Sequence, residues 1–344
     1  MNPADPTKAT GMARILKGLL PLLFLLIVVV ISYVVTQYRS VPIQVSSETT
    51  YLTEPLDEDG LPNYVQHLHN QLMKGVTPEN NGAVPFWQAA GSQAIPPEKQ
   101  VWYFAQLGMP VPPPRDPKFD VYEAAAEEIR ANGSPSGDAY DIAAGVITRP
   151  WRRGELPRLA KWMEDRSEEF SLLEQATTRN RFACPSPEAS GECSVVELTW
   201  PHLIVMRGMH RNLSARAMLR MGEGDMDGAW RDCQMMFRLA NHIESQSLID
   251  WLMKVAAYGQ ALTTTSALVE VETNAKRVKE IEAFVAKLPP IVDARQIIND
   301  FERLMYLSAV VDLSRGRFGV GALTGRTVTV SRLVVWNQIL RRGN

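Results

Sequence analysis

The longest hydrophobic pattern lies near the N-terminus. No charged residue occurs from Gly18 to Tyr38, and Leu19–Val35 is almost wholly apolar. A helix that spans a bilayer needs about 20 such residues. The run is longer than the ~7–15-residue apolar region of a cleaved signal peptide, and no small-x-small cleavage site follows it. The pattern therefore predicts an uncleaved signal anchor with one transmembrane helix over residues 18–38.

The charges that flank this run predict its orientation. Lys8, Arg14 and Lys17 precede it, whereas Arg39 is the sole nearby charge on the far side. Lys and Arg accumulate on the cytoplasmic side of single spans. We therefore expect residues 1–17 to form a short cytoplasmic tail. The rest of the chain after the span is expected outside the cytoplasm, anchored in the cytoplasmic (inner) membrane.

Short helices are predicted after the span. Residues 39–58 lack helical spacing and predict an extended stalk. Asp59 is the predicted cap of a helix that ends at Gly75. Thr77 followed by Pro78 is typical of a second helix start, because proline at the first helical position loses only an N–H that has no helical partner. The segment PPEKQVWYFAQLG repeats this pattern.

Longer helices follow in the second half of the chain, where apolar residues recur every three or four positions. Two of these stripes flank the break GEGDMDG and predict an antiparallel hairpin. No strand series appears. The predicted fold class is therefore mainly α, with stacked antiparallel helical hairpins that are bundle-like or solenoid-like. The stripes are formed by Met206, Met209, Leu213, Ala217 and Met221; Ala229, Trp230, Cys233, Phe237 and Ala240; Leu248, Leu252, Val255, Gly259, Leu262, Ser266 and Val269; Val278, Ile281, Val285 and Leu288; and Ile297, Phe301, Leu304, Ser308 and Val311.

A proline-rich segment divides the part outside the membrane. PVPPPRDPK, residues 110–118, cannot continue a helix and favours a stiff linker. It separates a small helical subdomain, residues 59–109, from a larger helical domain, residues 119–344. RAMLRMGEGDMDGAWRDCQMMFRLA resembles one tetratricopeptide unit, but no second copy follows at a 34-residue spacing.

Composition and charge exclude several classes of protein. The 344 residues are 45% hydrophobic and 22% charged, which is typical of a folded chain and unlike a disordered or polytopic membrane protein. The net charge of −2 excludes a generally basic nucleic-acid binder. Residues 313–344 carry six arginines and no acidic residue. That segment predicts contact with anionic lipid or an acidic partner, or a solvated face.

Several segments resemble one bacterial group. PLDEDGLPNYV, GVTPENN, DGAWRDCQMMFRLA and VVWNQILRRGN are similar to segments of a large paralogous family of membrane-anchored proteins of unknown function in planctomycetes. The resemblance implies an envelope location and no known activity, and it assigns no site residue. Members of that family tend to continue beyond the equivalent of Asn344, which implies that the last helical layer is incomplete here.

The cysteines offer one candidate cross-link. Cys184 and Cys193 bracket the polar loop CPSPEASGEC, and outside the cytoplasm such a pair predicts a disulfide worth about 2–3 kcal/mol. The alternative is a pair of thiols in a loop. Cys233 lies on an apolar stripe and is expected to be buried.

Familiar metal, cofactor and catalytic motifs are absent from the sequence. The histidines do not form a metal-binding motif. Glu223, Asp225 and Asp227 imitate a calcium loop, but its twelfth position is Gln234, where a glutamate is needed. No phosphate-binding, dinucleotide-binding or serine-nucleophile motif occurs. We therefore predict no metal and no cofactor.

The predicted function follows from these absences and from the helical repeats. We expect a single-pass, membrane-anchored interaction or scaffold protein of the bacterial envelope, with an envelope protein as partner and no nucleic acid. The alternative is an envelope hydrolase that acts on wall or polysaccharide material through dispersed acidic residues, because such residues leave no local motif. Asp250 and Asp312 are the first candidates for that chemistry.

Overall fold

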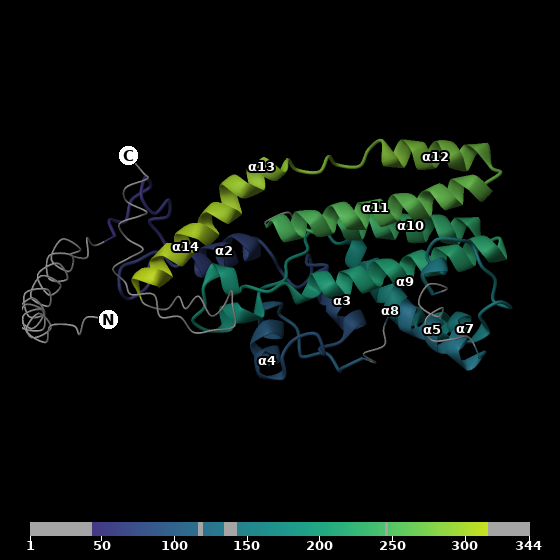
Figure 1. The fold of residues 1–344 in the computed structure, drawn as a ribbon, viewed down its shortest axis with the longest axis horizontal. Coiled ribbons are helices and arrows are strands. Elements are labelled where there is room, and N and C mark those ends of the chain that lie inside the picture. Colours follow the sequence, from purple (N-terminus) through teal and green to yellow (C-terminus); the bar gives the residue numbers. More distant parts are fainter. Residues whose placement is uncertain (1–42, 116–119, 134–142, 245–246, 316–344) are drawn as a thin grey trace, which may run out of the picture. The chain divides into compact units, whose positions relative to one another are not determined.

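The computed structural model describes residues 43–115, 120–133, 143–244 and 247–315 (Figure 1). The predicted transmembrane helix, residues 18–38, lies outside these residues, as do the cytoplasmic tail and the C-terminal arginine-rich segment from residue 316 onward. Among the helices that the structure does describe, none is long and apolar enough to cross a bilayer.

The chain divides into two compact units. The larger is Asn63–Ser308, and the smaller combines Met1–Pro62 with Ala309–Asn344. Over the described ranges the chain is mainly helical, as predicted, and extended pairing is limited to two isolated bridges. One bridge joins Leu56 to Pro62 in the smaller unit.

Three long helices form the centre of the larger unit. They are α9 (Pro201–Glu223), α10 (Met226–Asn241) and α11 (Leu248–Val271), and each packs on the other two (Figure 1). Gly224 ends α9 in the left-handed conformation with φ of 83°, and the Asp225 side chain accepts a hydrogen bond from the N–H of Gly228 to begin α10. These local signals explain the tight turn, and the predicted α9–α10 hairpin is confirmed.

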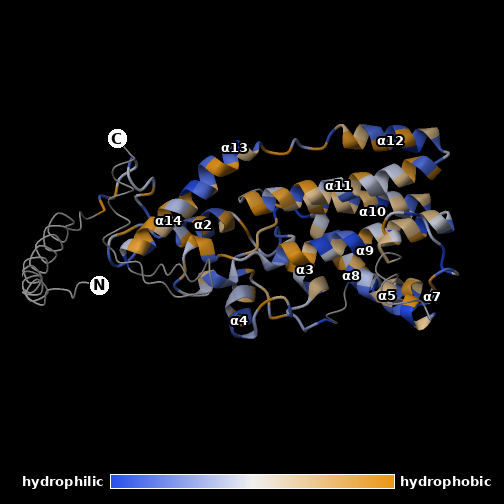
Figure 2. Ribbon diagram, viewed as in Figure 1, coloured by the Kyte–Doolittle hydropathy of each residue, from blue (hydrophilic) through white to orange (hydrophobic). Residues whose placement is uncertain are grey.

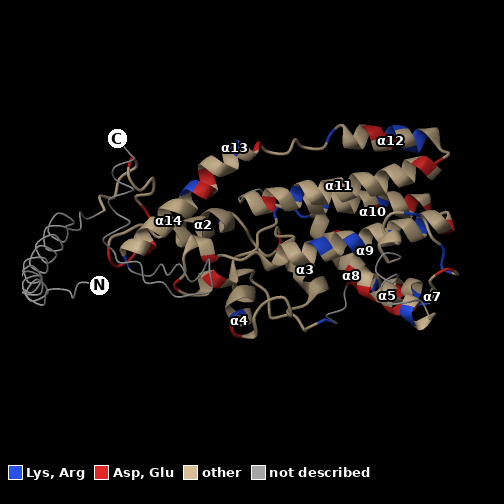
Figure 3. Ribbon diagram, in the orientation of Figure 1, with Lys and Arg blue, Asp and Glu red and all other residues tan. Residues whose placement is uncertain are grey.

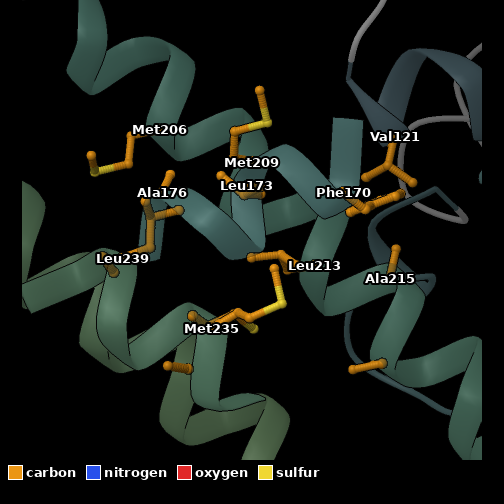
Figure 4. Close-up of a cluster of buried hydrophobic side chains, with 14 of the residues drawn as sticks. Val121, Phe170, Leu173, Ala176, Met206, Met209, Leu213, Ala215, Met235 and Leu239 are labelled. Atoms are coloured by element: carbon orange, nitrogen blue, oxygen red, sulfur yellow. The ribbon is translucent and has the colours of Figure 1, made fainter. Parts of the chain in front are cut away.

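Two helices that the hydrophobic pattern did not single out complete this core. They are α7 (Pro157–Asp165) and α8 (Ser167–Thr178). Helix α8 packs on α10 and on α3 (Ala83–Ala90), and α7 packs on α5 (Val121–Ala131). Figure 4 shows apolar side chains of α8, α9 and α10 converging in this core. Those labelled include Phe170, Leu173, Met206, Met209, Leu213, Met235 and Leu239.

The helices on either side of residues 110–118 share one core. The rings of Phe86 on α3 and Phe182, in the loop after α8, lie 5.4 Å apart. Helix α4 (Pro97–Gln106) begins at its proline as predicted and contributes Tyr103 and Phe104 to the same core. The proline-rich segment therefore joins helices that are buried together.

Two predicted helix starts are wrong. Helix α2 (Tyr64–Met73) is capped by Asn63, which accepts a hydrogen bond from Gln66, and not by Asp59. No helix begins at Thr77; α3 begins at Ala83 instead. The reason is the buried Asn81. Its side chain accepts hydrogen bonds from the N–H groups of Ala83 and the distant Ala183, and it donates one to the Ala183 carbonyl. This long-range contact sets the start of α3, and local capping signals do not reveal it.

The last described helices follow α11. Helix α12 (Ala275–Val285) places Phe284 against Trp230 and Phe237 of α10. A short helix, α13 (Ala294–Ile297), passes through a π-helical turn (Ile298–Glu302) into α14 (Arg303–Ser314). In the smaller unit, Arg315 forms ion pairs of 2.7 Å with both Asp57 and Asp59. This pairing gives Asp59 a role other than the predicted helix cap.

Candidate functional site

Helix α11 is positioned by strong local and long-range contacts. Ser247 and Asp250 form a reciprocal capping box at its first turn. Its packed side carries small residues and hydroxyls, and Thr264 Oγ1 lies 2.8 Å from Ser214 Oγ on α9. Small side chains allow the backbones of α9, α10 and α11 to approach closely. The buried side consists of Asp250, Ala257, Tyr258, Ala261, Thr264, Thr265 and Leu268.

The apolar stripe of α11 lies on the opposite side. Leu252 is 59% exposed, Leu262 is 44% exposed, and Val255 and Val269 are also exposed. The expectation that this stripe packs into the domain is therefore wrong. The periodicity correctly identifies an apolar face, but the small-residue face is the one that packs on α9 and α10.

We define the α11 face as the exposed residues of this helix between positions 249 and 269. Its members are large apolar, small or hydroxyl-bearing residues, and none is charged. Figure 2 shows much of the α11 ribbon in the hydrophobic colours, and Figure 3 shows few charged positions along it. Large exposed apolar patches are rare on monomeric soluble proteins, which makes this face the candidate interaction surface. The members are Ile249, Leu252, Val255, Ala256, Gly259, Leu262, Thr263, Ser266 and Val269.

Two charged residues in this stretch of α11 are directed elsewhere. Asp250 is buried and its Oδ2 accepts a hydrogen bond of 2.9 Å from the N–H of Ser247. Lys254 Nζ donates to the carbonyl oxygens of Ile243, at 3.0 Å, and Asn241, at 3.4 Å. The α11 face therefore stays uncharged over the turns between Ile249 and Val269.

A second feature is a polar pocket at one end of the same helices. It is an open depression whose space of about 290 Å³ includes solvent at its mouth. The start of α9, the end of α10 and the start of α11 meet there. It is lined by Leu72, Phe182, Cys184, Trp200, His202, His242, Glu244 and Asp250.

The two imidazoles of the polar pocket are neutral at physiological pH. Burial lowers the pKa of both His202 and His242 to about 4. His242 Nε2 lies 3.1 Å from the carbonyl oxygen of Ala176, and its ring stacks on Phe182 at 5.2 Å. The histidines are therefore part of the packed wall, with their rings held by aromatic and backbone contacts.

The two carboxylates suggested for catalysis belong to different compact units. Asp250 lines the polar pocket in the larger unit. Asp312 lies in the smaller unit, where its Oδ1 is 3.9 Å from Arg315 Nη1.

The remaining chemical candidates have structural roles. Asp225 caps α10, Asp227 pairs with Arg277, and Glu223 accepts a hydrogen bond from the N–H of Arg153. The apparent calcium loop is therefore a helix turn. Across the described ranges, no group of three or more His, Cys, Asp and Glu side chains is arranged to hold a metal ion.

The structure does not show the predicted disulfide between Cys184 and Cys193. Cys184 is a thiol buried beside Trp87 and Tyr103, and burial raises its pKa to about 12. Cys193 is half-buried. Cys233 is fully buried on α10, as its place on an apolar stripe predicted.

Comparison with known proteins adds no assignment. No protein-family model matches the chain, and neither a curated protein nor a solved structure matches it. The fold, the α11 face and the polar pocket are therefore the basis for assigning a function.

Proposed function

We propose that this protein is a membrane-anchored interaction module of the bacterial envelope, and that it binds protein through the α11 face. The single observation that supports this function is the exposure of Leu252, Val255, Leu262 and Val269 on one uncharged helix face. A protein partner that covers this face removes apolar surface from water, which stabilises the complex by about 25 cal/mol for each Å² buried.

The proposed location rests on the sequence. Residues 18–38 are the anchor, and the basic residues before them keep the N-terminus in the cytoplasm. The helical units then lie outside the cytoplasm, attached to the inner membrane by a single pass. The resemblance of PLDEDGLPNYV and GVTPENN to planctomycete membrane-anchored proteins supports the same location.

Site-specific photo-crosslinking in intact native cells tests the interaction. A photoreactive amino acid replaces Leu262 in one variant and Ile204 in the control. Ile204 is 77% exposed on α9 and lies outside the α11 face. We expect a discrete crosslinked protein from position 262 and none from position 204. If neither position yields a crosslinked protein, the proposed interaction function is wrong.

The polar pocket favours a second function, the envelope hydrolase. Asp250 and Glu244 lie at this pocket with two neutral imidazoles, and such groups can serve as general acids and bases. The space of about 290 Å³ includes open solvent at the mouth, so the enclosed part is smaller than an ordinary small-molecule site, and substrate would be held at the surface of the pocket.

Hydrolysis is tested with the full-length protein and purified wall polysaccharide, by measuring new reducing ends. If the wild type releases reducing ends and the Glu244→Gln variant does not, the hydrolase is established. Absence of release from the wild type would contradict this second function and leave the interaction module unaffected.

A further inference from the structure

A glycine at the middle of α11 has no role within the described structure. Gly259 is helical, and a Cβ atom added there would meet nothing within 4 Å. Glycine inside a helix costs about 1 kcal/mol relative to alanine. Gly222 on α9 differs, because its added Cβ would lie 1.9 Å from the carbonyl oxygen of Trp151. A contact with another molecule would explain the glycine at this position, because contacts within the described structure do not.

The α11 face is arranged symmetrically around this glycine. Helix α11 runs from Leu248 to Val271, so Gly259 lies at its midpoint. At about 100° per residue, every member of the face lies within about 80° of Gly259 around the helix axis. A second helix that crosses here therefore meets a position without a side chain at the centre of the face.

We infer that the protein covering the α11 face is a second copy of this chain, and that two α11 helices pair antiparallel about a two-fold axis at Gly259. This inference rests on the proposed interaction function. A two-fold axis requires a self-complementary surface. Pairing about Gly259 places Leu252 opposite Ser266 and Leu262 opposite Ala256, so large side chains meet small ones near the axis. At the outer ends of the face, Ile249 meets Val269.

Charge does not oppose this arrangement within the face, because no member of the face is charged. Beyond it, the exposed Glu270 of one copy lies opposite position 248, the first residue of α11, in the other. The N–H groups of Ser247 and Leu248 already donate to the carboxylates of Asp250 and Glu302. The ends of the helix therefore add no attraction, and the pairing depends on the uncharged face.

The first experiment measures the oligomeric state of the full chain in detergent by analytical ultracentrifugation. We expect a dimer for the wild type. Gly259→Arg places two charges at the axis and is expected to raise the dimer dissociation constant about tenfold or more. The protomer tolerates this change, because the added side chain enters open space. Ile204→Arg, the matched control, introduces the same charge on α9 and is expected to remain dimeric.

A cysteine at the axis tests the geometry. Gly259→Cys is expected to form a disulfide between copies on mild oxidation, because the two positions face each other. Ser266→Cys is the control, since its copies lie about 20 Å apart along the helices at 1.5 Å per residue. The wild type shows the background from its native cysteines. If both cysteine variants form disulfide-linked dimers to the same extent, the two-fold axis does not lie at Gly259.

The outcomes distinguish this inference from the proposed function. A monomeric wild type, or a Gly259→Arg variant that dimerises like the wild type, overturns the inference. If photo-crosslinking from Leu262 captures a different protein, the pairing is overturned and the interaction function stands. If it captures nothing at all, both are overturned.

Discussion

Asp232 illustrates how single residues stabilise the core. Its carboxylate is fully buried on α10, lies 3.1 Å from Arg216 Nε and pairs with Arg220 at 2.8 Å. The Arg216 guanidinium also lies 3.7 Å from the centroid of the Phe170 ring. A buried carboxylate with two arginines ties α9 to α10 through charge as well as packing.

Removing this carboxylate leaves the largely buried Arg216 guanidinium without its ion pair, while Arg220 keeps Asp225 at 3.7 Å. We expect Asp232→Ala to lower the free energy of unfolding by about 3–5 kcal/mol, measured by urea denaturation. Asp165→Ala is the control, because the Lys161–Asp165 pair is exposed. Its expected loss is below about 1 kcal/mol. Equal losses for the two variants would contradict a structural role for the buried cluster.

Three buried histidines predict acid sensitivity. Burial lowers the pKa of His202, His210 and His242 to about 4. Between pH 6.5 and 4 the unfolded chain binds protons that the folded chain does not, so stability falls as the pH falls. Above pH 6.5 the imidazoles are neutral in both states and this effect disappears.

The His210→Leu variant measures how much one of these histidines contributes to the pH dependence of stability. Within the described residues, neither ring nitrogen of His210 has a hydrogen-bond partner, so leucine costs little at pH 8. Between pH 6 and 5 the variant should lose stability less steeply than the wild type, by about 1.4 kcal/mol per pH unit. Parallel pH profiles would show that His210 does not stay neutral in the folded protein.

The Cys184 thiol predicts a specific pattern of chemical modification. Because it is buried with a pKa raised to about 12, it should resist iodoacetamide in the folded protein and react after unfolding without reductant. Peptide mass spectrometry reads this out. Modification of Cys184 and Cys193 that requires a reductant would instead establish the disulfide that the loop sequence suggests.

At the scale of elements, local signals predicted those helices whose boundaries are set locally. The proline that begins α4 and the turn between α9 and α10 are encoded in adjacent residues. The start of α3 is different, because Asn81 bonds a segment about a hundred residues away. Such contacts leave no periodic or capping pattern, and α3 was therefore expected too early in the chain.

Asn81 tests this long-range control of an element. Its amide accepts from Ala83 and Ala183 and donates to the Ala183 carbonyl, each at 3.0 Å. Asn81→Ala leaves these buried groups unpaired and should lower the free energy of unfolding by about 3 kcal/mol. Asn70→Ala, at an exposed position on α2, should change it by less than about 0.5 kcal/mol. Comparable losses would contradict the assigned role.

Helix α11 shows where hydrophobic periodicity stops being informative. The stripe through Leu252, Val255 and Leu262 was recognised, but its spacing says only that an apolar face exists. Whether that face meets its own domain or another protein depends on which side has residues that allow close packing. In α11 the side that packs on α9 and α10 is the one with small residues, which include Ala257, Ala261 and Thr264. The sequence therefore predicted this stripe as a packing face of stacked hairpins, but did not single it out as a site.

For the whole molecule, the proposed anchor and the α11 face belong together. Attachment by residues 18–38, as proposed, would confine copies of the chain to a plane and so raise the effective concentration of the α11 faces for one another. Association would then remove the exposed apolar side chains of this face from water. We propose that the face lies outside the cytoplasm and is covered by a second copy.

Cysteine accessibility in intact cells tests both the location and the covering of the α11 face. Ile204→Cys and Leu262→Cys are treated with a membrane-impermeant maleimide, and the wild type gives the background of native cysteines. We predict that Ile204→Cys is labelled in intact cells, whereas Leu262→Cys is labelled only after the extracted protein is diluted below the dimer dissociation constant. Equal labelling of both in intact cells would contradict a covered face. Labelling of both only in opened cells would contradict the location.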